Sequence, residues 1–232
     1  MNAISIITAR GGSKGIPRKN IKLLNNKPLV YYSIHASINS KLIKNTYVTT
    51  EDNEIAEISL NYGAKIIKRP IELSKDESSS VDTILHSLDY LEETDKLPEF
   101  FVLLQPTSPL RTSEDIDNAI NLFIENDCNA LVSVCKLDHS SMLNFSIKNN
   151  YLKNNCDESY FNTRRQELPT LYSPNGAIYI ITSRALRKSK SFFPKKTIPY
   201  IMPKEKSIDL DTPFDFKLAE LLLKDMGNFH EK

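Results

Sequence analysis

The sequence predicts an α/β fold in which a mostly parallel β-sheet is covered by helices. Over the first two-thirds of the chain, short apolar runs alternate with longer amphipathic runs, which is the pattern of parallel strands connected by helices. The chain has 232 residues, of which 40% are hydrophobic and 25% charged, so it can bury a sizeable core and is not wholly disordered. We therefore expect residues 1–232 to form one domain.

The first elements alternate regularly. Residues 3–9 (AISIITA) predict a buried strand because the run contains no charge. Residues 28–39 predict a helix, since Pro28 suits a first helical turn and apolar side chains recur on one face. A second strand at residues 46–50, a helix at 53–62 and a third strand at 65–68 follow.

The next elements carry clearer signals. The helix over residues 81–91 has its apolar side chains on one face: Val81, Ile84, Leu85, Leu88 and Leu91. Residues 100–104 (FFVLL) have the composition of a central strand. A helix is expected over residues 113–125, where Thr112 and Asp115 fit a capping box, and a strand over 130–135.

The alternation breaks at residues 137–173, which are polar and show no sustained period. Such a long irregular stretch inside a compact domain is usually a functional or interaction element. Regular elements return as strands at residues 177–182 and 197–202. A final helix follows Thr212, with Pro213 at its first position and Asp215 at its third.

Composition and charge exclude several classes of protein. Lys and Arg total 30 against 29 Asp and Glu, a formal net charge of +1, so neither nucleic acid nor an anionic membrane is indicated as a partner. No apolar run approaches the roughly 20 residues of a membrane helix, and the N-terminal run is too short for a signal peptide. The three cysteines lack a Cys-x-x-Cys pair, which disfavours a disulfide framework or a zinc site. We expect a cytoplasmic protein.

The segment after the first strand, residues 10–20, has a composition suited to binding phosphate. It contains three of the six glycines and four cationic side chains. Glycines let backbone N–H groups face an anion, and Lys and Arg neutralise phosphate charge. The segment matches neither standard phosphate-loop pattern, and the alternative is a solvated basic turn. We favour triphosphate binding because ligands of open α/β sheets bind beyond the carboxyl ends of the strands.

Three further segments follow or precede predicted elements at the same edge. Two prolines stiffen residues 105–111, which is either a binding loop or a rigid connector that ends in a helix cap. Asp209 and Asp211 alternate in an extended segment, so both carboxylates face one side, where they suit a cation such as Mg²⁺. Residues 174–176 (Pro-Asn-Gly) predict a tight turn into the strand that follows.

Four segments together resemble one enzyme family. Residues 9–20 (ARGGSKGIPRKN), 103–111 (LLQPTSPLR), 173–180 (SPNGAIYI) and 207–215 (SIDLDTPFD) resemble, in order and spacing, the acylneuraminate cytidylyltransferases, which are the CMP-sialic acid synthetases. The resemblance implies a Rossmann-like sheet with helices on both faces and a homodimer formed through the insertion 137–173. It also implies a Mg²⁺-dependent reaction of CTP with an acidic nonulosonic sugar, which yields the CMP-sugar and pyrophosphate for lipopolysaccharide or capsule biosynthesis.

The resemblance also implies roles for individual residues. Arg10, Lys19 and Asp211 would serve in catalysis, and Asp209 and Asp211 would bind the metal. The nucleotide would contact Arg10, Gly11, Gly12, Ser13, Lys14, Lys19, Asn20, Arg69, Pro106, Thr107, Ser108 and Arg111. The sugar would contact Gln105, Arg165, Gln166, Tyr179, Phe192 and Phe193. An aromatic pair such as Phe192-Phe193 is otherwise more often part of a core.

The chain departs from the family pattern at three places. Ser173 replaces an arginine that often precedes Pro-Asn-Gly, no lysine lies among residues 140–143 directly after His139, and Thr50-Glu51-Asp52 stands where Ser-Thr-Asp is common. The first two changes remove cations near the sugar, which favours slightly a less polar sugar such as legionaminate over N-acetylneuraminate. The alternatives are a glycosyltransferase that uses Asp-x-Asp for its metal, and a catalytically inactive nucleotide-binding module.

Overall fold

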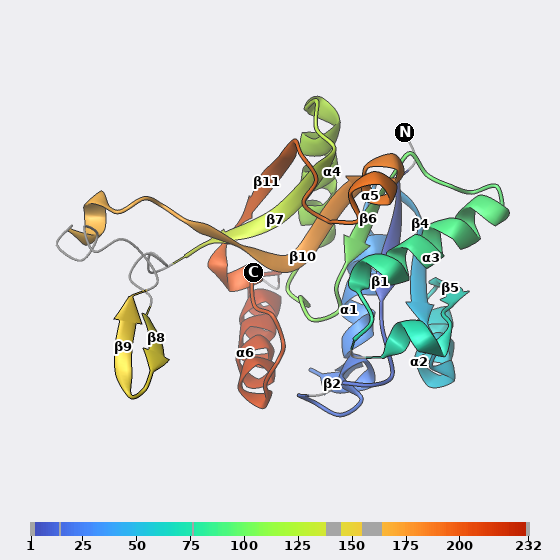
Figure 1. The fold of residues 1–232 in the computed structure, drawn as a ribbon. Helices are drawn as coiled ribbons and strands as arrows, with labels where there is room; N and C mark the ends of the chain where they lie inside the picture. Colours follow the sequence, from blue (N-terminus) through green and yellow to red (C-terminus); the bar gives the residue numbers. More distant parts are fainter. Residues whose placement is uncertain (1–2, 14, 76, 138–144, 155–163, 231–232) are drawn as a thin grey trace.

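A seven-stranded sheet forms the centre of the molecule in the computed structural model, which describes residues 3–13, 15–75, 77–137, 145–154 and 164–230 (Figure 1). The strands of this sheet are β1 (Ala3–Thr8), β4 (Ile43–Thr50), β5 (Lys65–Lys68), β6 (Phe100–Leu104), β7 (Ala130–Lys136), β10 (Tyr172–Thr182) and β11 (Thr197–Met202). Their order is β11-β7-β10-β6-β1-β4-β5. β10 runs antiparallel to β6 and β7, and the other four pairs are parallel. The predicted mostly parallel sheet is confirmed.

Helices cover both faces of this sheet, as predicted. On one face, α1 (Leu29–Ile38), α2 (Asn53–Asn61) and α4 (Ser113–Glu125) contribute to a core cluster with apolar side chains of the strands. On the other face, α3 (Ser80–Glu93) and α5 (Ser183–Ser189) contribute to a second cluster. The arrangement is Rossmann-like. The predicted capping box is present at the start of α4, where Thr112 and Asp115 bond to each other's backbone N–H.

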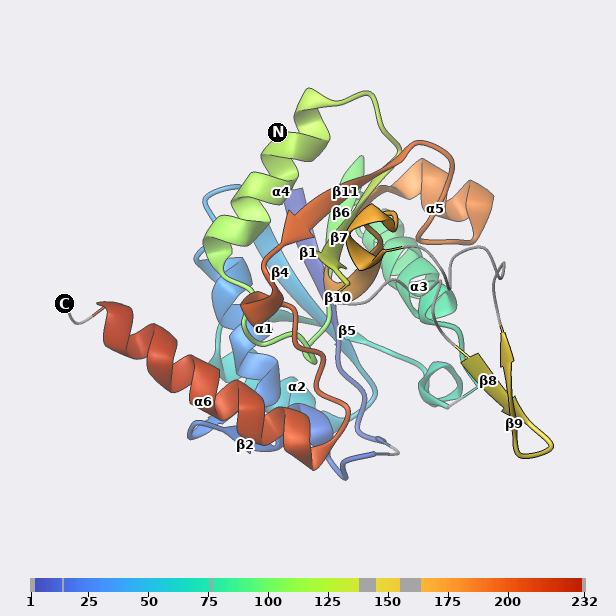
Figure 2. The same ribbon diagram turned by 90° about the vertical axis from the view of Figure 1, so that its left-hand side faces the viewer.

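The last helix, α6 (Pro213–His230), packs against the N-terminal part of the chain (Figure 2). A third cluster joins Phe216 and Ala219 of α6 to Ile16, Leu24 and Leu29, and Leu210 is fully buried in it. Burial of this apolar surface fixes the segment before α6 beside the glycine-rich loop after β1. The loop after β1 and the segment before α6, which are far apart in the sequence, therefore meet at the carboxyl edge of the sheet.

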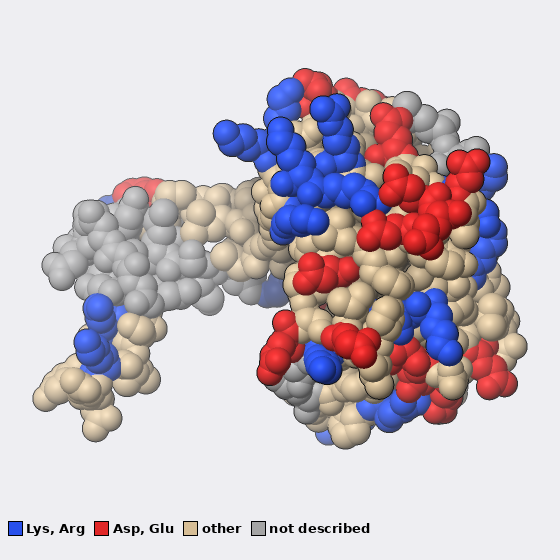
Figure 3. All heavy atoms as spheres, turned by 45° about the vertical axis from the view of Figure 1, so that its right-hand side comes forward, with Lys and Arg blue, Asp and Glu red and all other residues tan. Residues whose placement is uncertain are grey.

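Two short hairpins were not predicted. β2 (Leu23–Leu24) pairs with β3 (Lys27–Pro28), and β8 (Phe145–Lys148) pairs with β9 (Tyr151–Asn154). Each hairpin turns through an Asn-Asn pair with positive φ at both residues, the conformation of a two-residue type I′ turn. The second hairpin lies inside residues 137–173 and stands away from the main body in Figures 1 and 3.

The surface mixes charges of both signs. On the face in Figure 3, the basic patch at the top adjoins an acidic patch, and both signs recur below. Opposite charges also pair between helices: Arg187 of α5 forms ion pairs with Asp89 and Glu92 of α3. In the part of the chain that the structure describes, no helix combines the length and the apolar character needed to cross a membrane.

Candidate active site

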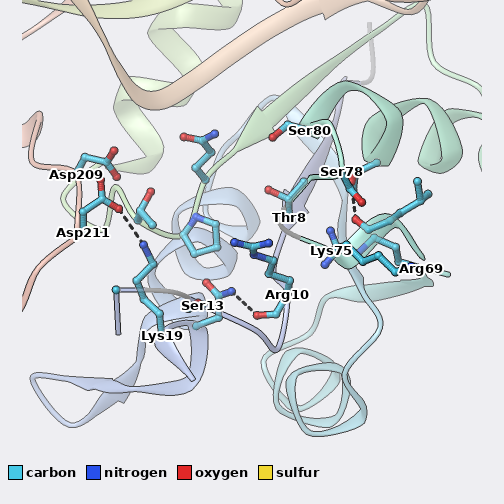
Figure 4. A pocket seen from close by; sticks show the side chains of 17 residues that line it. Thr8, Arg10, Ser13, Lys19, Arg69, Lys75, Ser78, Ser80, Asp209 and Asp211 are labelled. Carbon is cyan, nitrogen blue, oxygen red and sulfur yellow. Dashed lines mark hydrogen bonds and ion pairs between the residues drawn. The ribbon is translucent and has the colours of Figure 1, made fainter. Parts of the chain in front are cut away.

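A cavity of about 640 Å³ opens at the carboxyl edge of the sheet, where the sequence placed the candidate residues (Figure 4). The segments after β1, β5 and β6 and the segment before α6 line it. The predicted residues that the structure brings together there are Arg10, Ser13, Lys19, Asn20, Arg69, Gln105, Pro106, Thr107, Asp209 and Asp211. Parallel strands end at the same edge, so residues far apart in sequence meet at one place.

One end of the cavity joins Lys19 to the two aspartates. Lys19 Nζ donates to the carbonyl oxygen of Leu210 at 2.8 Å and to Oδ1 of Asp211 at 3.1 Å. The backbone N–H of Leu210 donates to the carbonyl oxygen of Thr107, so the same segment is also fixed to the loop after β6. Gly15 lies so close that an added Cβ would be 2.7 Å from the carbonyl oxygen of Asp211. A larger residue at position 15 would push the two loops apart.

Asp209 is partly shielded from solvent at this end. Burial raises the pKa of its carboxyl above the ordinary value, and the charges of Asp211 and Asp215 add to this, although Thr107 and Lys19 act in the opposite direction. Asp215 in turn accepts the backbone N–H of Asp211 at 3.1 Å and fixes that residue at the start of α6. The shift follows first from burial and then from the neighbouring carboxylates, so a cation bound beside Asp209 would favour its ionised form.

The donor set of this end fits Mg²⁺. Mg²⁺ binds through one or two carboxylates and completes its shell with water and substrate phosphates, and Asp209 and Asp211 supply two carboxylates beside a cavity. Among the described residues, no group of three or more His, Cys, Asp or Glu side chains forms a site made of protein ligands alone. The arrangement therefore suits a metal that arrives with, or is completed by, a phosphate ligand.

The contacts of the glycine-rich loop differ from those predicted from the sequence. Gly11 and Gly12 do not line the cavity, and the Gly11 N–H donates to the protein's own Glu51 carboxylate at Oε1, 2.7 Å away, instead of facing the cavity. Asn20 is buried and donates to the carbonyl oxygen of Arg10 at 2.8 Å, which closes the loop on itself. Arg18 pairs with Asp52 and Glu54 and anchors the outer part of the loop. Lys14 lies outside the described residues.

The other end of the cavity joins the predicted Arg69 to residues that were not predicted. Arg69 lies there with Thr8, Lys75, Ser78 and Ser80 (Figure 4). The remaining unpredicted lining residues are Gly15, Leu73 and Thr83. The serine-rich run over residues 78–80 follows β5 and precedes a helix, a position that could have marked it as part of the site.

The loop over residues 105–111 divides into lining and supporting residues. Gln105, Pro106 and Thr107 line the cavity, whereas Ser108 and Arg111 are buried beneath the loop and do not line it. The Arg111 guanidinium donates to the carbonyl oxygen of Ser108 at 2.8 Å and to the hydroxyl of Ser33 at 2.5 Å. Burial lowers the pKa of Arg111 to about 10. The structure thus places Arg111 as a support of the loop.

The predicted turn at residues 174–176 is wrong: the segment is an irregularity within β10. The pairing register of β10 with β7 shifts between Pro174 and Tyr179. Side chains accept backbone N–H groups at this irregularity: Oδ1 of the buried Asn175 accepts the Ala177 N–H at 3.2 Å, and the Ser133 hydroxyl accepts the Ile178 N–H at 2.7 Å. The Asn175 side chain is itself fixed, because its Oδ1 accepts the Ser133 hydroxyl at 2.6 Å and its Nδ2 donates to Ser207 at 2.9 Å. Gly176 has φ +74° and an added Cβ there would lie 2.7 Å from Oε1 of Gln105. The motif therefore supports the loop that carries Gln105.

The remaining candidates for the sugar lie outside the cavity. Tyr179 packs against Phe192 and Phe193, with ring centroids 5.6 and 6.3 Å apart. Phe192 contacts the second core cluster, and Phe193 is 54% exposed. Gln166 is exposed in a short helical turn (Arg165–Glu167), the orange segment far from the sheet in Figure 1. The Arg165 side chain and residues around His139 lie outside the described part.

Comparison of the sequence with known proteins identifies a matching family and several relatives. The model of a family described as "Cytidylyltransferase" matches residues 4–228. The chain is 38% identical over 221 residues to "N-acylneuraminate cytidylyltransferase" of Streptococcus agalactiae serotype V, with 93% of this chain and 52% of the relative covered. It is 33% identical over 230 residues to "CMP-N,N'-diacetyllegionaminic acid synthase" of Legionella pneumophila, with 97% of each covered. The chain thus spans about half the length of the first of these relatives.

Structural comparison agrees on the fold. A solved CMP:2-keto-3-deoxy-manno-octonic acid synthetase complexed with CTP superimposes with a TM-score of 0.74 at 14% identity, and 97% of this chain and 100% of that chain are covered. At this identity the likeness establishes a shared fold.

Proposed function

Because the chain belongs to the cytidylyltransferase family, we propose that it transfers CMP from CTP to the anomeric hydroxyl of a nonulosonic acid and releases pyrophosphate. The observation that carries this proposal is the joint cavity: two cations of the glycine-rich loop and two aspartates from the other end of the chain line one space. A nucleoside triphosphate needs both groups, since cations neutralise its charge and carboxylates bind its metal.

The chemistry consists mainly of positioning and charge neutralisation. The oxygen of the anomeric hydroxyl attacks the α-phosphorus of CTP while the bond to the bridging oxygen of the β-phosphate breaks; pyrophosphate leaves with the electron pair of that bond, and the hydroxyl proton is released to solvent. Lys19 and Arg10 stabilise the charge that develops on the triphosphate. Mg²⁺, held by Asp209 and Asp211, would supply further positive charge at the α-phosphate. Gln105, beside these groups, is placed to orient the sugar.

We place the nucleoside at the end formed by Arg69, Ser78 and Ser80. The aspartates and Lys19 occupy the opposite end, and the triphosphate must reach them. Hydroxyls and a guanidinium are suitable partners for the acceptors of a base and a ribose. The product, a CMP-sugar, would serve the assembly of surface lipopolysaccharide or capsule, and CTP is available for the reaction in the cytoplasm.

The decisive experiment measures pyrophosphate release from each of the four nucleoside triphosphates with N-acetylneuraminate, legionaminate and a neutral hexose. We expect release from CTP with an acidic sugar only. Release of a nucleotide from a sugar nucleotide without pyrophosphate would indicate a glycosyltransferase. Binding of CTP without turnover on any sugar would indicate an inactive nucleotide-binding module.

We further propose a homodimer formed through residues 137–173. The hairpin β8–β9 stands away from the body and exposes large apolar side chains, with Ile147 78% and Leu152 69% exposed. Apolar side chains gathered on a projecting hairpin are typical of an interface.

Sedimentation should give a dimer at micromolar concentration, and the double change Ile147→Asp and Leu152→Asp should give a monomer. Asn150→Asp, which adds a charge in the turn and removes no apolar group, is the control; an active monomeric wild type would refute the dimer.

A further inference from the structure

Glu51 lies directly behind the wall of the cavity without lining it. It follows β4, and its side chain is 14% exposed. One carboxylate oxygen accepts the Gly11 N–H at 2.7 Å, and the other accepts Nη2 of Arg69 at 2.7 Å. One side chain therefore connects the loop after β1 to the segment after β5, which lie on opposite sides of β4 in the sheet order.

Arg69 depends on this carboxylate for compensation of its charge. Its side chain is only 4% exposed, and burial lowers the pKa of the guanidinium, with the nearby charge of Arg10 acting in the same direction. Its Nε is buried and has no hydrogen-bond partner within the described structure. A buried guanidinium without a counter-charge is strongly unfavourable, so Glu51 fixes the position that Arg69 adopts.

The same carboxylate also fixes the start of the glycine-rich loop. Gly11 also lies against the Asp52 side chain, in the segment after β4, because an added Cβ would be 2.5 Å from Oδ2 of Asp52. The neighbouring Arg10 lines the cavity and donates to the carbonyl oxygen of Ser74 at 3.4 Å. Burial opposes the ionisation of Glu51, but the Ser74 hydroxyl, the Gly11 N–H and the Arg69 guanidinium outweigh it and lower the pKa of this carboxyl, which is therefore ionised at neutral pH.

We propose that Glu51 is a positioning residue for nucleotide binding, which holds Arg69 and the Arg10-Gly11 backbone in one fixed arrangement at the nucleoside end of the cavity. The proposal rests on the proposed function, since it assumes that this end takes the nucleoside of CTP. A preorganised wall lowers the cost of binding, so loss of the contact weakens CTP and leaves the sugar largely unaffected.

The test compares Glu51→Gln, Glu51→Asp and a control in the same region. Glu51→Gln removes the charge and keeps the size of the side chain. Glu51→Asp keeps the charge but is one methylene too short to bridge Gly11 and Arg69. Glu57→Gln removes the same charge from an exposed position on α2, away from the cavity. If Glu51→Gln does not fold, Glu51→Asp still tests the proposal.

Three readouts separate positioning from a merely structural role. Both Glu51 variants should raise the dissociation constant and the KM for CTP about tenfold, which is the loss of one charge-assisted hydrogen bond. The KM for the sugar should change less than about twofold, because Glu51 bonds to Gly11 and Arg69 and not to Gln105, the residue proposed to orient the sugar. The thermal midpoint of Glu51→Asp should stay near that of the wild type.

An unchanged CTP dissociation constant in both variants, or equal increases in both KM values, would overturn the proposal. Calorimetric titration of CTP does not require turnover. If the wild type binds CTP but releases no pyrophosphate, the proposed function fails while the role of Glu51 is still measured.

Discussion

Lys19 and Asp211 form an ion pair, with Nζ and Oδ1 3.1 Å apart, although 192 positions separate them in the sequence. The pair lies at the mouth of the cavity, where the Lys19 side chain is 16% and the Asp211 side chain 72% exposed. Lys19 is also bonded to the Leu210 carbonyl, so its position does not depend on Asp211 alone. We therefore expect the exposed carboxylate to exchange this partner for a bound cation without moving the loop.

Asp211→Asn should lower turnover at least about tenfold and leave the fold intact, because a lost carboxylate weakens a hard-cation site without creating a cavity. Pyrophosphate release measured against Mg²⁺ concentration should show the defect most strongly at limiting metal. Asp225→Asn, on the exposed surface of α6, is the matched control. Normal activity of Asp211→Asn at limiting Mg²⁺ would remove Asp211 from the metal site.

Arg111→Lys should lower the free energy of unfolding by about 3 kcal/mol, since a lysine cannot satisfy the separate acceptors on Ser108 and Ser33 and leaves buried polar groups unpaired. Urea denaturation measures this change. Arg184→Lys, at an exposed position, should change it by less than about 0.5 kcal/mol. Equal stability of the two variants would mean that Arg111 does not support the loop and acts instead as a ligand.

The difference between Arg111 and Arg10 shows what the sequence could not reveal. Both arginines lie in segments that leave the carboxyl ends of strands, and the sequence predicted nucleotide contacts for both. Arg10 lines the cavity, whereas Arg111 is turned under its own loop by Ser33 of α1. That outcome depends on the packing of α1 beside the loop, which is a tertiary contact between residues 78 positions apart.

The hairpins show a signal that was present but not used. Asn25-Asn26 and Asn149-Asn150 both lie between residues of strand type, and an Asn pair favours the positive φ of a type I′ turn. In contrast, long elements with a clear period, such as the helix around Leu88 and the strand Phe100–Leu104, were predicted within one or two residues. Periodicity identifies elements that bury a face, and short hairpins bury too little to produce one.

Asp52→Asn should reveal the contribution of the ion pair with Arg18 through its pH dependence. The hydrogen bond from Arg18 lowers the pKa of Asp52 in the folded protein below its ordinary value of 3.8. A carboxyl of this kind stabilises the fold above its unfolded pKa, and the contribution is lost as the pH falls through the lower folded pKa. The pair is exposed on the Arg18 side, so we expect a loss of less than about 1 kcal/mol at pH 7.

Asparagine is an equally good N-cap, so the start of α2, where Asp52 accepts the Ile55 N–H, is preserved in this variant. Urea denaturation of wild type and Asp52→Asn at pH 7, 5 and 3 measures the difference. The difference in the free energy of unfolding between the two proteins should be smaller at pH 3, below the ordinary pKa of 3.8, than at pH 7. A difference that stays constant down to pH 3 would show that the cap or the local packing, and not the ionised pair, is responsible.

The sugar preference should follow the aromatic surface formed by Tyr179, Phe192 and Phe193. Phe193 is 54% exposed and packs edge-on against Tyr179, whose pKa is raised by burial and by the charge of Asp209. The charge of Asp209, one of the two proposed metal ligands, thus acts on this surface, which we expect to suit the deoxygenated tail of legionaminate better than the hydroxylated tail of N-acetylneuraminate. An apolar surface discriminates against one hydroxyl by only about 10- to 200-fold, so both sugars should react.

We expect kcat/KM for legionaminate to exceed that for N-acetylneuraminate at saturating CTP. The change Phe193→Ser should bring the ratio of the two kcat/KM values towards one without a change in the KM for CTP. A wild-type ratio well below one would reverse the preference and leave the reaction itself unaffected.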